Sequence, residues 1–336
     1  MKITIIKNSN HFFLKFISTI TLIFAFLTLH LPQAFAIIEA DREVIPGEAQ
    51  YVGLIEQWEN YEGWYGICSG TLVAPRIVLT AAHCVSDVSE ERWLRINFPT
   101  HSLKLMDAKP INITGFIYHF KYDEQQSYDL VDLETNEVLE SVVGYVPPGD
   151  SEYDDDIALL YLEEAVSDIK YPKLAGNSTK ILPNWRVYGW GLTSSDSSTL
   201  LSSPSNTLNT TSVKDATAEM VELLEDPMNN MLGAYQLNNF GSIQTICYGD
   251  SGGPLVDGKG VVIGITSFSM AESCEEITPA VYTKVAKYRS WIYRAMARLK
   301  VSVYRSQLIS LPIDGGSYHL PPNFKKPNKM VVLTIR

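Results

Sequence analysis

Short apolar runs, each broken by glycine, proline or polar residues, recur along most of this 336-residue chain. Runs of this length that are rich in valine, isoleucine, threonine and aromatic residues are typical of β-strands. We predict strands at 51–55, 66–74, 76–82, 93–98, 111–120, 156–162, 185–191, 253–256, 260–268 and 280–285. Many short strands at this spacing favour an all-β barrel or sandwich.

One stretch has helical periodicity instead. Between about residues 284 and 300, apolar side chains recur three or four positions apart, and lysines and arginines lie between them. This pattern is typical of an amphipathic helix with one buried face. We expect a closing helix that packs on a barrel.

The first 36 residues differ from the rest of the chain. Three lysines precede or border the apolar run 16–31, and the sequence PQAFA follows at 32–36. This order is typical of a secretory signal peptide that is cleaved after Ala36. An uncleaved membrane anchor is the alternative, but about 16 apolar residues are short for a span. No later run is long enough, so we expect an exported chain, extracellular or periplasmic, without stable membrane association.

The net negative charge of the chain bears on which macromolecules it can bind. The formal net charge of −11 becomes −14 once the three lysines of the signal peptide are removed. Such an acidic surface disfavours nucleic acid as a partner, because the phosphate backbone is itself negative.

Three segments stand apart from the strand pattern. Residues 122–156 contain twelve acidic residues and no lysine or arginine, and we interpret them as a solvated loop. A calcium site is the alternative there, although no EF-hand spacing is present. Residues 193–212 are rich in serine and threonine and are predicted to form a polar loop. We assign no role to the tail 301–336.

The four cysteines are an even set in a chain expected to be exported. They are Cys68, Cys84, Cys247 and Cys274. Two disulfides are expected on that ground, and four cysteines allow three pairings. A zinc site is the alternative, but no Cys-x-x-Cys pair is present.

The sequence GDSGGP at 249–254 raises the question of nucleophilic chemistry. A serine between glycines is more often part of a turn, so Ser251 needs a base and an orienting acid. His83 ends an apolar run, and Asp156 begins one, so that a buried partner is expected for this carboxylate. Asp154 and Asp155 are expected to face solvent.

Three motifs, taken in order, carry a resemblance. TAAHC at 80–84, DIALL at 156–160 and GDSGGP resemble the trypsin/chymotrypsin family of serine proteases. The resemblance covers about residues 37–300 and implies two six-stranded antiparallel β-barrels with a C-terminal helix. The implied domains are 37–168 and 169–300. The implied activity is that of a monomeric serine endopeptidase on protein or peptide substrates, without a cofactor or metal.

The resemblance also implies roles for individual residues. Ser251 matches the nucleophile, His83 the general base and Asp156 the acid that orients it. The backbone N–H groups of Gly249 and Ser251 match the oxyanion hole. Ser267 matches a serine that supports the acid beside the substrate pocket.

Two disulfides and an activation step follow from the same resemblance. Cys68 pairs with Cys84, and Cys247 pairs with Cys274. Asp250 matches the acid that pairs with a newly cut α-amino group, and the alignment places that group on Ile37, directly after the expected signal cleavage. Signal peptidase itself would then create the active terminus. Glu39 and Ala40 stand where the family usually has glycines.

The expected substrate pocket is neutral and narrow. Thr245 stands at the position of the pocket floor, and Ser269 and Ala280 stand at the two wall positions. We therefore expect small or medium uncharged residues at P1. The alternative is that glutamates 272, 275 and 276 reach the pocket from a rearranged loop and favour basic residues.

Two other functions are compatible with parts of the sequence. A non-catalytic protease homologue that acts as a binding protein is the first, although all three triad residues are present. The second is an α/β-hydrolase, because GDSGG also fits the Gly-x-Ser-x-Gly pattern. That fold would need Asp314 and His319 as partners, and both lie in the proline- and glycine-rich tail.

Overall fold

The structure is a computed structural model, and all the helices and strands given below lie within residues 35–336. It describes residues 37, 40–59, 63–86, 93–99, 109–119, 121–122, 128–131, 138–142, 155–192, 205–224, 229–237, 243–244, 246–269, 279–304 and 331–335. The expected signal peptide lies outside these residues. So do Asp154, Thr245, Cys274, the three glutamates near Cys274, Asp314 and His319.

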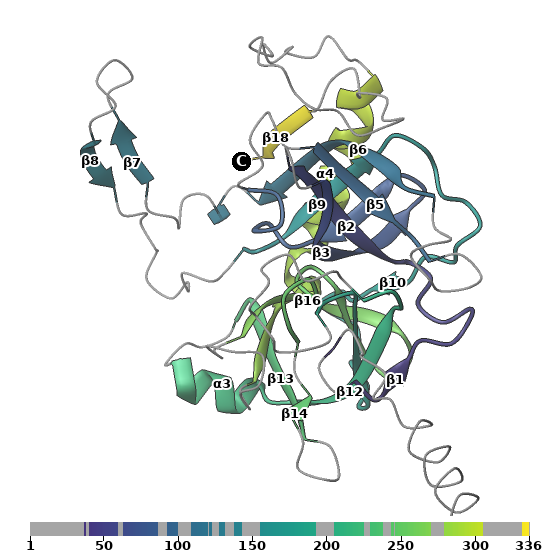
Figure 1. Ribbon diagram of the computed structural model, residues 1–336. Coiled ribbons are helices and arrows are strands. Elements are labelled where there is room, and N and C mark those ends of the chain that lie inside the picture. Colours follow the sequence, from purple (N-terminus) through teal and green to yellow (C-terminus); the bar gives the residue numbers. More distant parts are fainter. Residues whose placement is uncertain are drawn as a thin grey trace, which may run out of the picture. The chain divides into compact units, whose positions relative to one another are not determined.

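The first barrel is a closed antiparallel sheet (Figure 1). Its strands are β2 (Val52–Glu59), β3 (Gly63–Ala74), β4 (Ile77–Thr80), β5 (Trp93–Asn97), β6 (Ile111–His119) and β9 (Ala158–Leu162). They follow one another around the barrel in the order β6-β5-β2-β3-β4-β9, and the pairing of β6 with β9 closes it.

The second barrel has the same number of strands and also closes on itself. Its strands are β11 (Trp185–Gly189), β12 (Asn209–Asp215), β13 (Met231–Leu237), β15 (Pro254–Val256), β16 (Val261–Ser269) and β17 (Ala280–Lys284). The pairing of β12 with β13 closes the order β12-β11-β15-β16-β17-β13. Three short strands extend this sheet: β1 (Arg42–Glu43), β10 (Lys173–Leu174) and β14 (Ile243–Gln244). The prediction of two six-stranded antiparallel barrels is confirmed, and the α/β-hydrolase alternative is wrong.

The predicted C-terminal helix is confirmed as α4 (Val285–Tyr304). Its apolar face, which includes Tyr288, Trp291 and Ile292, is buried in the same hydrophobic cluster as β6 and β9 of the first barrel. The helix follows the second barrel in sequence and packs against β6 and β9 of the first barrel as well as β16 of the second. A second helix, α3 (Thr217–Leu224), packs through Met220 against the second barrel.

The first and the last described strands each pair with the barrel formed mainly by the other half of the chain. Strand β1 lies within the predicted first domain but pairs with β12 of the second barrel. Strand β18 (Val331–Ile335), in the tail, pairs in parallel with residues 115–119 of β6. Each barrel therefore receives an element from the opposite end of the chain.

The expected polar loop at 193–212 is wrong for its last residues. Asn209, Thr210 and Thr211 are buried and belong to β12. Two of their polar groups donate hydrogen bonds inside the barrel: the Thr210 hydroxyl donates to the Val187 carbonyl at 2.9 Å, and the Asn209 amide nitrogen donates to the Thr207 carbonyl at 2.7 Å. Hydrogen bonds made by the folded chain offset the cost of burying these side chains.

The acidic segment 122–156 contains a hairpin of β7 (Tyr128–Val131) and β8 (Val138–Val142). Most of its other residues lie outside the described part of the chain. Within the described residues, no helix is both long enough and apolar enough to cross a membrane.

Candidate active site

His83 and Asp156 are in direct contact at the ends of two neighbouring strands of the first barrel. Histidine Nδ1 lies 2.8 Å from Asp156 Oδ2, and the backbone N–H of His83 donates to Oδ1 at 2.9 Å. The side chain of Asp156 is only 5 % exposed, whereas that of His83 is 33 % exposed. The acid is therefore buried behind the imidazole, and the imidazole borders solvent.

Residues from the second barrel hold Asp156 from the other side. The Ser267 hydroxyl donates to Oδ2 at 2.5 Å, and the Thr283 hydroxyl donates to the Asp156 carbonyl at 2.8 Å. Burial by itself raises the pKa of Asp156. The charge and hydrogen bonds of His83, together with the Ser267 hydrogen bond, outweigh burial and leave this pKa below its usual range. The carboxylate is thus kept ionised in a buried position.

Ser251 lies in the turn before β15, and its backbone is tied to the first barrel. The backbone N–H of Ser69 in β3 donates to the Ser251 carbonyl at 2.7 Å. The neighbouring Cys68 forms a disulfide with Cys84, which directly follows His83. Strand β3 therefore brings the serine turn and the histidine turn to the same place.

Gly252 fixes how closely this turn packs on the first barrel. Its φ is +78°, and a Cβ there would come within 2.0 Å of the Thr80 hydroxyl and 2.4 Å of the Ser69 carbonyl. Only glycine fits a backbone this close to β3 and β4 in this conformation. Gly252, which follows Ser251, therefore packs against Thr80, which precedes His83 by three residues.

The serine turn contains two backbone donors that differ from their neighbours in hydrogen bonding. Neither the N–H of Gly249 nor that of Ser251 donates a hydrogen bond to a described residue. The backbone N–H groups of their neighbours Cys247, Asp250 and Gly252 all do. Gly249 has a φ of +95°, and a Cβ there would lie 2.9 Å from the Gly191 Cα. A glycine is therefore required at the position that presents the first of these donors.

Asp250 is fully buried behind the same turn. Its carboxylate accepts hydrogen bonds from the backbone N–H groups of Gly191 and Cys247, both at 2.9 Å. Burial raises its pKa to about 7, although the two hydrogen bonds act in the opposite direction. No described residue supplies a cation to this carboxylate.

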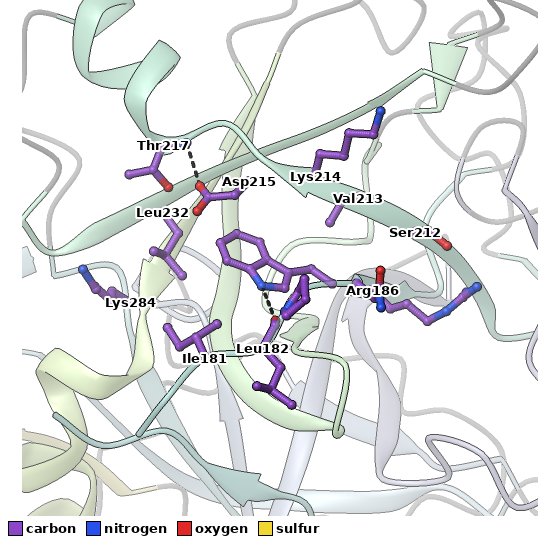
Figure 2. Close-up of a pocket in the computed structure, with 13 residues that line it drawn as sticks. Ile181, Leu182, Arg186, Ser212, Val213, Lys214, Asp215, Thr217, Leu232 and Lys284 are labelled. Atoms are coloured by element: carbon purple, nitrogen blue, oxygen red, sulfur yellow. Dashed lines mark hydrogen bonds between the residues drawn. The ribbon is translucent and has the colours of Figure 1, made fainter. Parts of the chain in front are cut away.

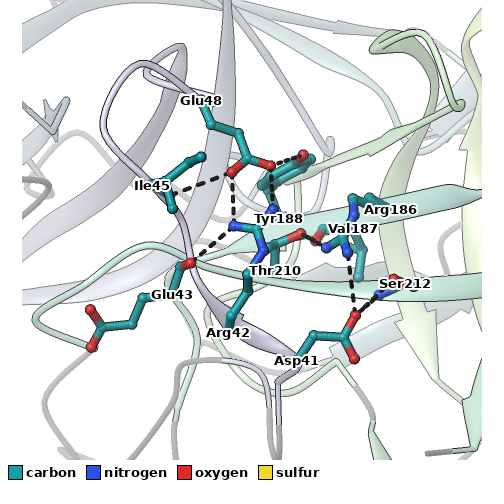
Figure 3. A network of polar contacts seen from close by, with 10 residues as sticks. All are labelled: Asp41, Arg42, Glu43, Ile45, Glu48, Arg186, Val187, Tyr188, Thr210 and Ser212. Atoms are coloured by element: carbon teal, nitrogen blue, oxygen red, sulfur yellow. Dashed lines mark hydrogen bonds and ion pairs between the residues drawn. The ribbon is translucent and has the colours of Figure 1, made fainter.

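The chain segment after Ile37 is clamped to the second barrel (Figure 3). The Arg42 guanidinium donates two hydrogen bonds to Glu48, at 2.8 and 2.9 Å, and the Tyr188 hydroxyl also donates to Glu48 at 2.9 Å. Asp41 accepts hydrogen bonds from the backbone and hydroxyl of Ser212. Ile37 itself is completely buried in the apolar cluster of this barrel. Its nitrogen is a peptide nitrogen in the full chain, so its pairing with Asp250 stays a prediction.

Comparison with known proteins assigns this arrangement to a family. The family model described as Trypsin matches residues 46–292, which include His83, Asp156 and Ser251. The chain belongs to the trypsin family. Members of this family are serine endopeptidases, and the chain is accordingly a hydrolase that acts on polypeptides.

Several curated proteins are similar to this trypsin-family chain over most of its length. Granzyme M of Rattus norvegicus is 28% identical over 266 residues, which cover 76% of this chain and 88% of the relative. Kallikrein-8 of Mus musculus is 28% identical over 260 residues, covering 76% and 85%. The solved structure of neuropsin, a serine protease expressed in the limbic system of mouse brain, matches with a TM-score of 0.53 and 27% identity. That match covers 77% of this chain and all of the neuropsin chain.

The disulfides of the trypsin-family site are described in part. The Cys68–Cys84 bond is confirmed, with an S–S distance of 2.03 Å. Cys247 is disulfide-bonded as well, but its predicted partner Cys274 lies outside the described residues. The donor atoms of Cys68, His83 and Cys84 lie within 4.8 Å of one another, as a metal site would require. The two sulfurs are already bonded to each other, which explains this cluster without a metal.

Of the four predicted pocket residues, Ser267 and Ser269 lie on β16 and Ala280 lies on the adjacent β17. Ser269 at the end of β16 is paired in register with Ala280 at the start of β17. Thr245, the predicted floor, lies outside the described residues. The walls are therefore neighbours, and the specificity stays a prediction.

A cavity in the second barrel lies away from these residues (Figure 2). It has a volume of about 930 Å³ and is lined by residues around Trp185, whose indole N–H donates to the Leu182 carbonyl at 2.9 Å. None of the predicted site residues lines it.

The expectation that Asp155 faces solvent is wrong. This residue is 4 % exposed, and its Oδ1 lies 2.9 Å from Nδ1 of His119, the last residue of β6. The His119 ring lies edge-on to the rings of Tyr288 and Trp291, with centroids 5.4 and 5.5 Å apart. The sequence offered one signal that this histidine is buried, its position at the end of an apolar strand.

Proposed function

We propose that Ser251, His83 and Asp156 are the catalytic triad of this serine endopeptidase. Ser251 Oγ attacks the scissile carbonyl carbon while His83 Nε2 accepts its proton. The same nitrogen returns the proton to the leaving amine, and water then hydrolyses the acyl-enzyme by the reverse sequence of transfers. The observation that carries the proposal is the 2.8 Å contact between His83 Nδ1 and the buried carboxylate of Asp156.

The two backbone donors of the serine turn that make no hydrogen bond to a described residue support an oxyanion hole at Gly249 and Ser251. Backbone N–H groups of this kind are available to the negative oxygen of the tetrahedral intermediate. Such preorganised donors stabilise charge that develops only in the transition state, and losing one typically costs about 10²- to 10³-fold in rate.

The triad is tested by hydrolysis of a peptide library and by labelling with a fluorophosphonate, a reagent for activated serines. Ser251→Ala is expected to abolish both signals. The exposed Ser167→Ala serves as a matched control and is expected to leave both unchanged. Labelling and hydrolysis that persist in Ser251→Ala would overturn the proposal.

We propose that this enzyme prefers small or medium uncharged residues at P1. The proposed pocket has a neutral floor at Thr245 and side chains at both walls, Ser269 and Ala280. A lysine or arginine would enter such a pocket without a counter-charge, which disfavours it. The measurement is kcat/KM for peptides that differ only at P1. Ser269→Gly and Ala280→Gly are expected to shift the preference towards larger residues, and efficient cleavage after arginine would contradict the pocket assignment.

We further propose that the protein is exported and begins at Ile37 in its active form. A buried carboxylate with a raised pKa and no cation among the described residues, Asp250, is suited to receive a new α-ammonium group. The clamp at Asp41, Arg42 and Glu48 already holds the following segment on the second barrel. Mass spectrometry of the active exported protein tests this. A terminus other than Ile37 on a fully active species would overturn it.

Finally, we propose that the enzyme works as a monomer and needs no cofactor. The triad supplies the proton transfers and the nucleophile from its own side chains. A chelator is therefore expected to leave kcat unchanged. Calcium at the acidic segment 122–156 is the alternative, and chelator-induced loss of activity or of thermal stability, restored by calcium, would establish it.

A further inference from the structure

The backbone on either side of Asp156 has an unusual conformation. Asp155 has a φ of +65°, in the left-handed region that residues other than glycine rarely adopt and that aspartate and asparagine tolerate best. The N–H of Ile157 donates to the carbonyl of Asp155 at 2.8 Å, which places Asp156 at the centre of a three-residue turn. The direction of the Asp156 side chain therefore depends on how Asp155 is held.

Asp155 is held from two other elements. Its backbone N–H donates to the Tyr288 hydroxyl of α4 at 3.1 Å. Its carboxylate is in ion-pair contact with His119 Nδ1 at 2.9 Å, although the two groups are not aligned as a linear hydrogen bond. The backbone N–H of His119 also donates to the Ile157 carbonyl at 3.0 Å. The turn around Asp156 is thus fastened to the end of β6 and to α4.

Both members of this second histidine–aspartate pair are shielded from water. The side chains of His119 and Asp155 are 11 % and 5 % exposed. The rings of Tyr288 and Trp291 restrict the imidazole from α4. A buried ion-pair contact between packed groups has few alternative geometries, so it can fix a neighbouring turn.

We propose that His119, Asp155 and Tyr288 are positioning residues that set the direction of the Asp156 carboxylate toward His83. The proposal rests on the triad proposed above. Its physical basis is that a misplacement of about 1 Å in a catalytic group can cost about 10²-fold in rate. The pair would act on the chemical step and leave substrate binding largely unchanged.

The experiment compares Asp155→Ala, Asp155→Asn and Tyr288→Phe with the unmodified enzyme. Asp155→Ala is expected to lower kcat about 10- to 100-fold per folded molecule, with KM within about twofold. Asp155→Asn is expected to retain most of kcat, because asparagine tolerates the left-handed conformation and keeps a polar side chain beside His119. Tyr288→Phe removes only the hydroxyl that accepts the Asp155 N–H, and is expected to lower kcat several-fold even if Asp155→Ala does not fold.

Asp257→Ala is the matched control for a purely structural effect. Asp257 is also a buried turn aspartate, and it accepts backbone hydrogen bonds from Leu182, Lys259 and Val261 in the second barrel. Its loss is expected to lower the melting temperature without changing kcat per folded molecule. If Asp155→Ala and Tyr288→Phe behave in the same way, the positioning role is overturned. Failure of the triad proposal would be recognised independently, because Ser251→Ala would then retain activity whatever the Asp155 variants do.

Discussion

At the scale of single residues, two consecutive buried aspartates, Asp155 and Asp156, each contact a histidine. His83 and Asp156 could be predicted because each stands at the edge of an apolar run and within a familiar motif. Asp155 could not, because its partner His119 lies on a distant strand and only the closed barrel brings them together. The apolar run that begins at Asp156 indicates burial of this aspartate, but nothing in the sequence around Asp155 indicates that it is buried as well.

The first residue-scale prediction concerns the hydrogen bond that Ser267 donates to Asp156. Ser267→Ala is expected to lower kcat/KM by about tenfold, because Asp156 loses one charge-assisted hydrogen bond but keeps both contacts with His83. Asp156→Asn should cost far more, about 10⁴-fold. Ser205→Ala, at another buried serine, is the control and should leave kcat/KM unchanged. Equal losses in the two serine variants would contradict a specific role for Ser267.

The buried Asp250 predicts a pH dependence of stability. Its folded pKa of about 7 is above its ordinary value of 3.8, so the folded state retains a proton that the unfolded state releases between these values. In a chain that keeps residues before Ile37, the free energy of unfolding should therefore fall, by a few kcal/mol, as pH rises from about 4 to about 7. Urea unfolding of Ser251→Ala, with and without Asp250→Asn, measures this, and the Ser251→Ala background prevents self-digestion.

The Asp250→Asn variant shows whether Asp250 causes the pH dependence of the unfolding free energy. Asp250→Asn cannot titrate, so the difference in unfolding free energy between the two proteins should change across this pH range. A constant difference would show that other groups cause the slope. In a form that begins at Ile37, the proposed α-ammonium partner should remove most of it, because a nearby cation lowers the pKa of a carboxyl group.

At the scale of elements, apolar strands were predictable and polar ones were not. The runs that became β2, β3, β6, β9 and β16 are apolar because barrel interiors exclude water. Strand β12 was missed because Asn209, Thr210 and Thr211 are polar, and the Thr210 hydroxyl finds its acceptor, the Val187 carbonyl, on the neighbouring strand β11. A pattern of polarity along one segment cannot report partners that arrive from another.

The burial of α4 on the first barrel is an element-scale prediction. Ile292→Ala is expected to lower the free energy of unfolding by about 2–5 kcal/mol, because this side chain is fully buried in the shared apolar cluster. Tyr293→Ala is the control at the next position, where the side chain is 51 % exposed. It should change stability by less than about 1 kcal/mol. Denaturant unfolding of both variants gives the comparison, and similar losses would contradict the packing described for α4.

At the scale of the whole molecule, the two barrels are joined by elements that cross between them. The N-terminal β1 pairs with the second barrel, and the C-terminal α4, which also contacts β16 of the second barrel, packs on β6 and β9 of the first. The sequence predicted the two barrels through the family resemblance, but it could not reveal this exchange of ends, because pairing partners are set by the closed topology.

This exchange predicts a single cooperative unfolding transition. A first barrel made without the rest of the chain would lack α4, and its apolar surface under that helix would be exposed. A second barrel made alone would lack the pairing of β1 with β12. Neither barrel should therefore be stable alone. Calorimetry of Ser251→Ala should therefore show one transition with matching calorimetric and van't Hoff enthalpies. Residues 37–168, expressed as a fragment, should not fold. Two separate transitions, or a folded fragment, would contradict the prediction.

The position of α4 also sets an order of events during biosynthesis. A ribosome releases β2 to β9 well before the helix that must cover them, and an exported chain crosses its membrane in the same direction. The first barrel therefore waits, with an uncovered apolar face, until the last part of the chain arrives. Premature termination before residue 285 would leave the complete triad sequence in a molecule that quality-control proteases can recognise, and such products should be degraded rather than accumulate as active enzyme.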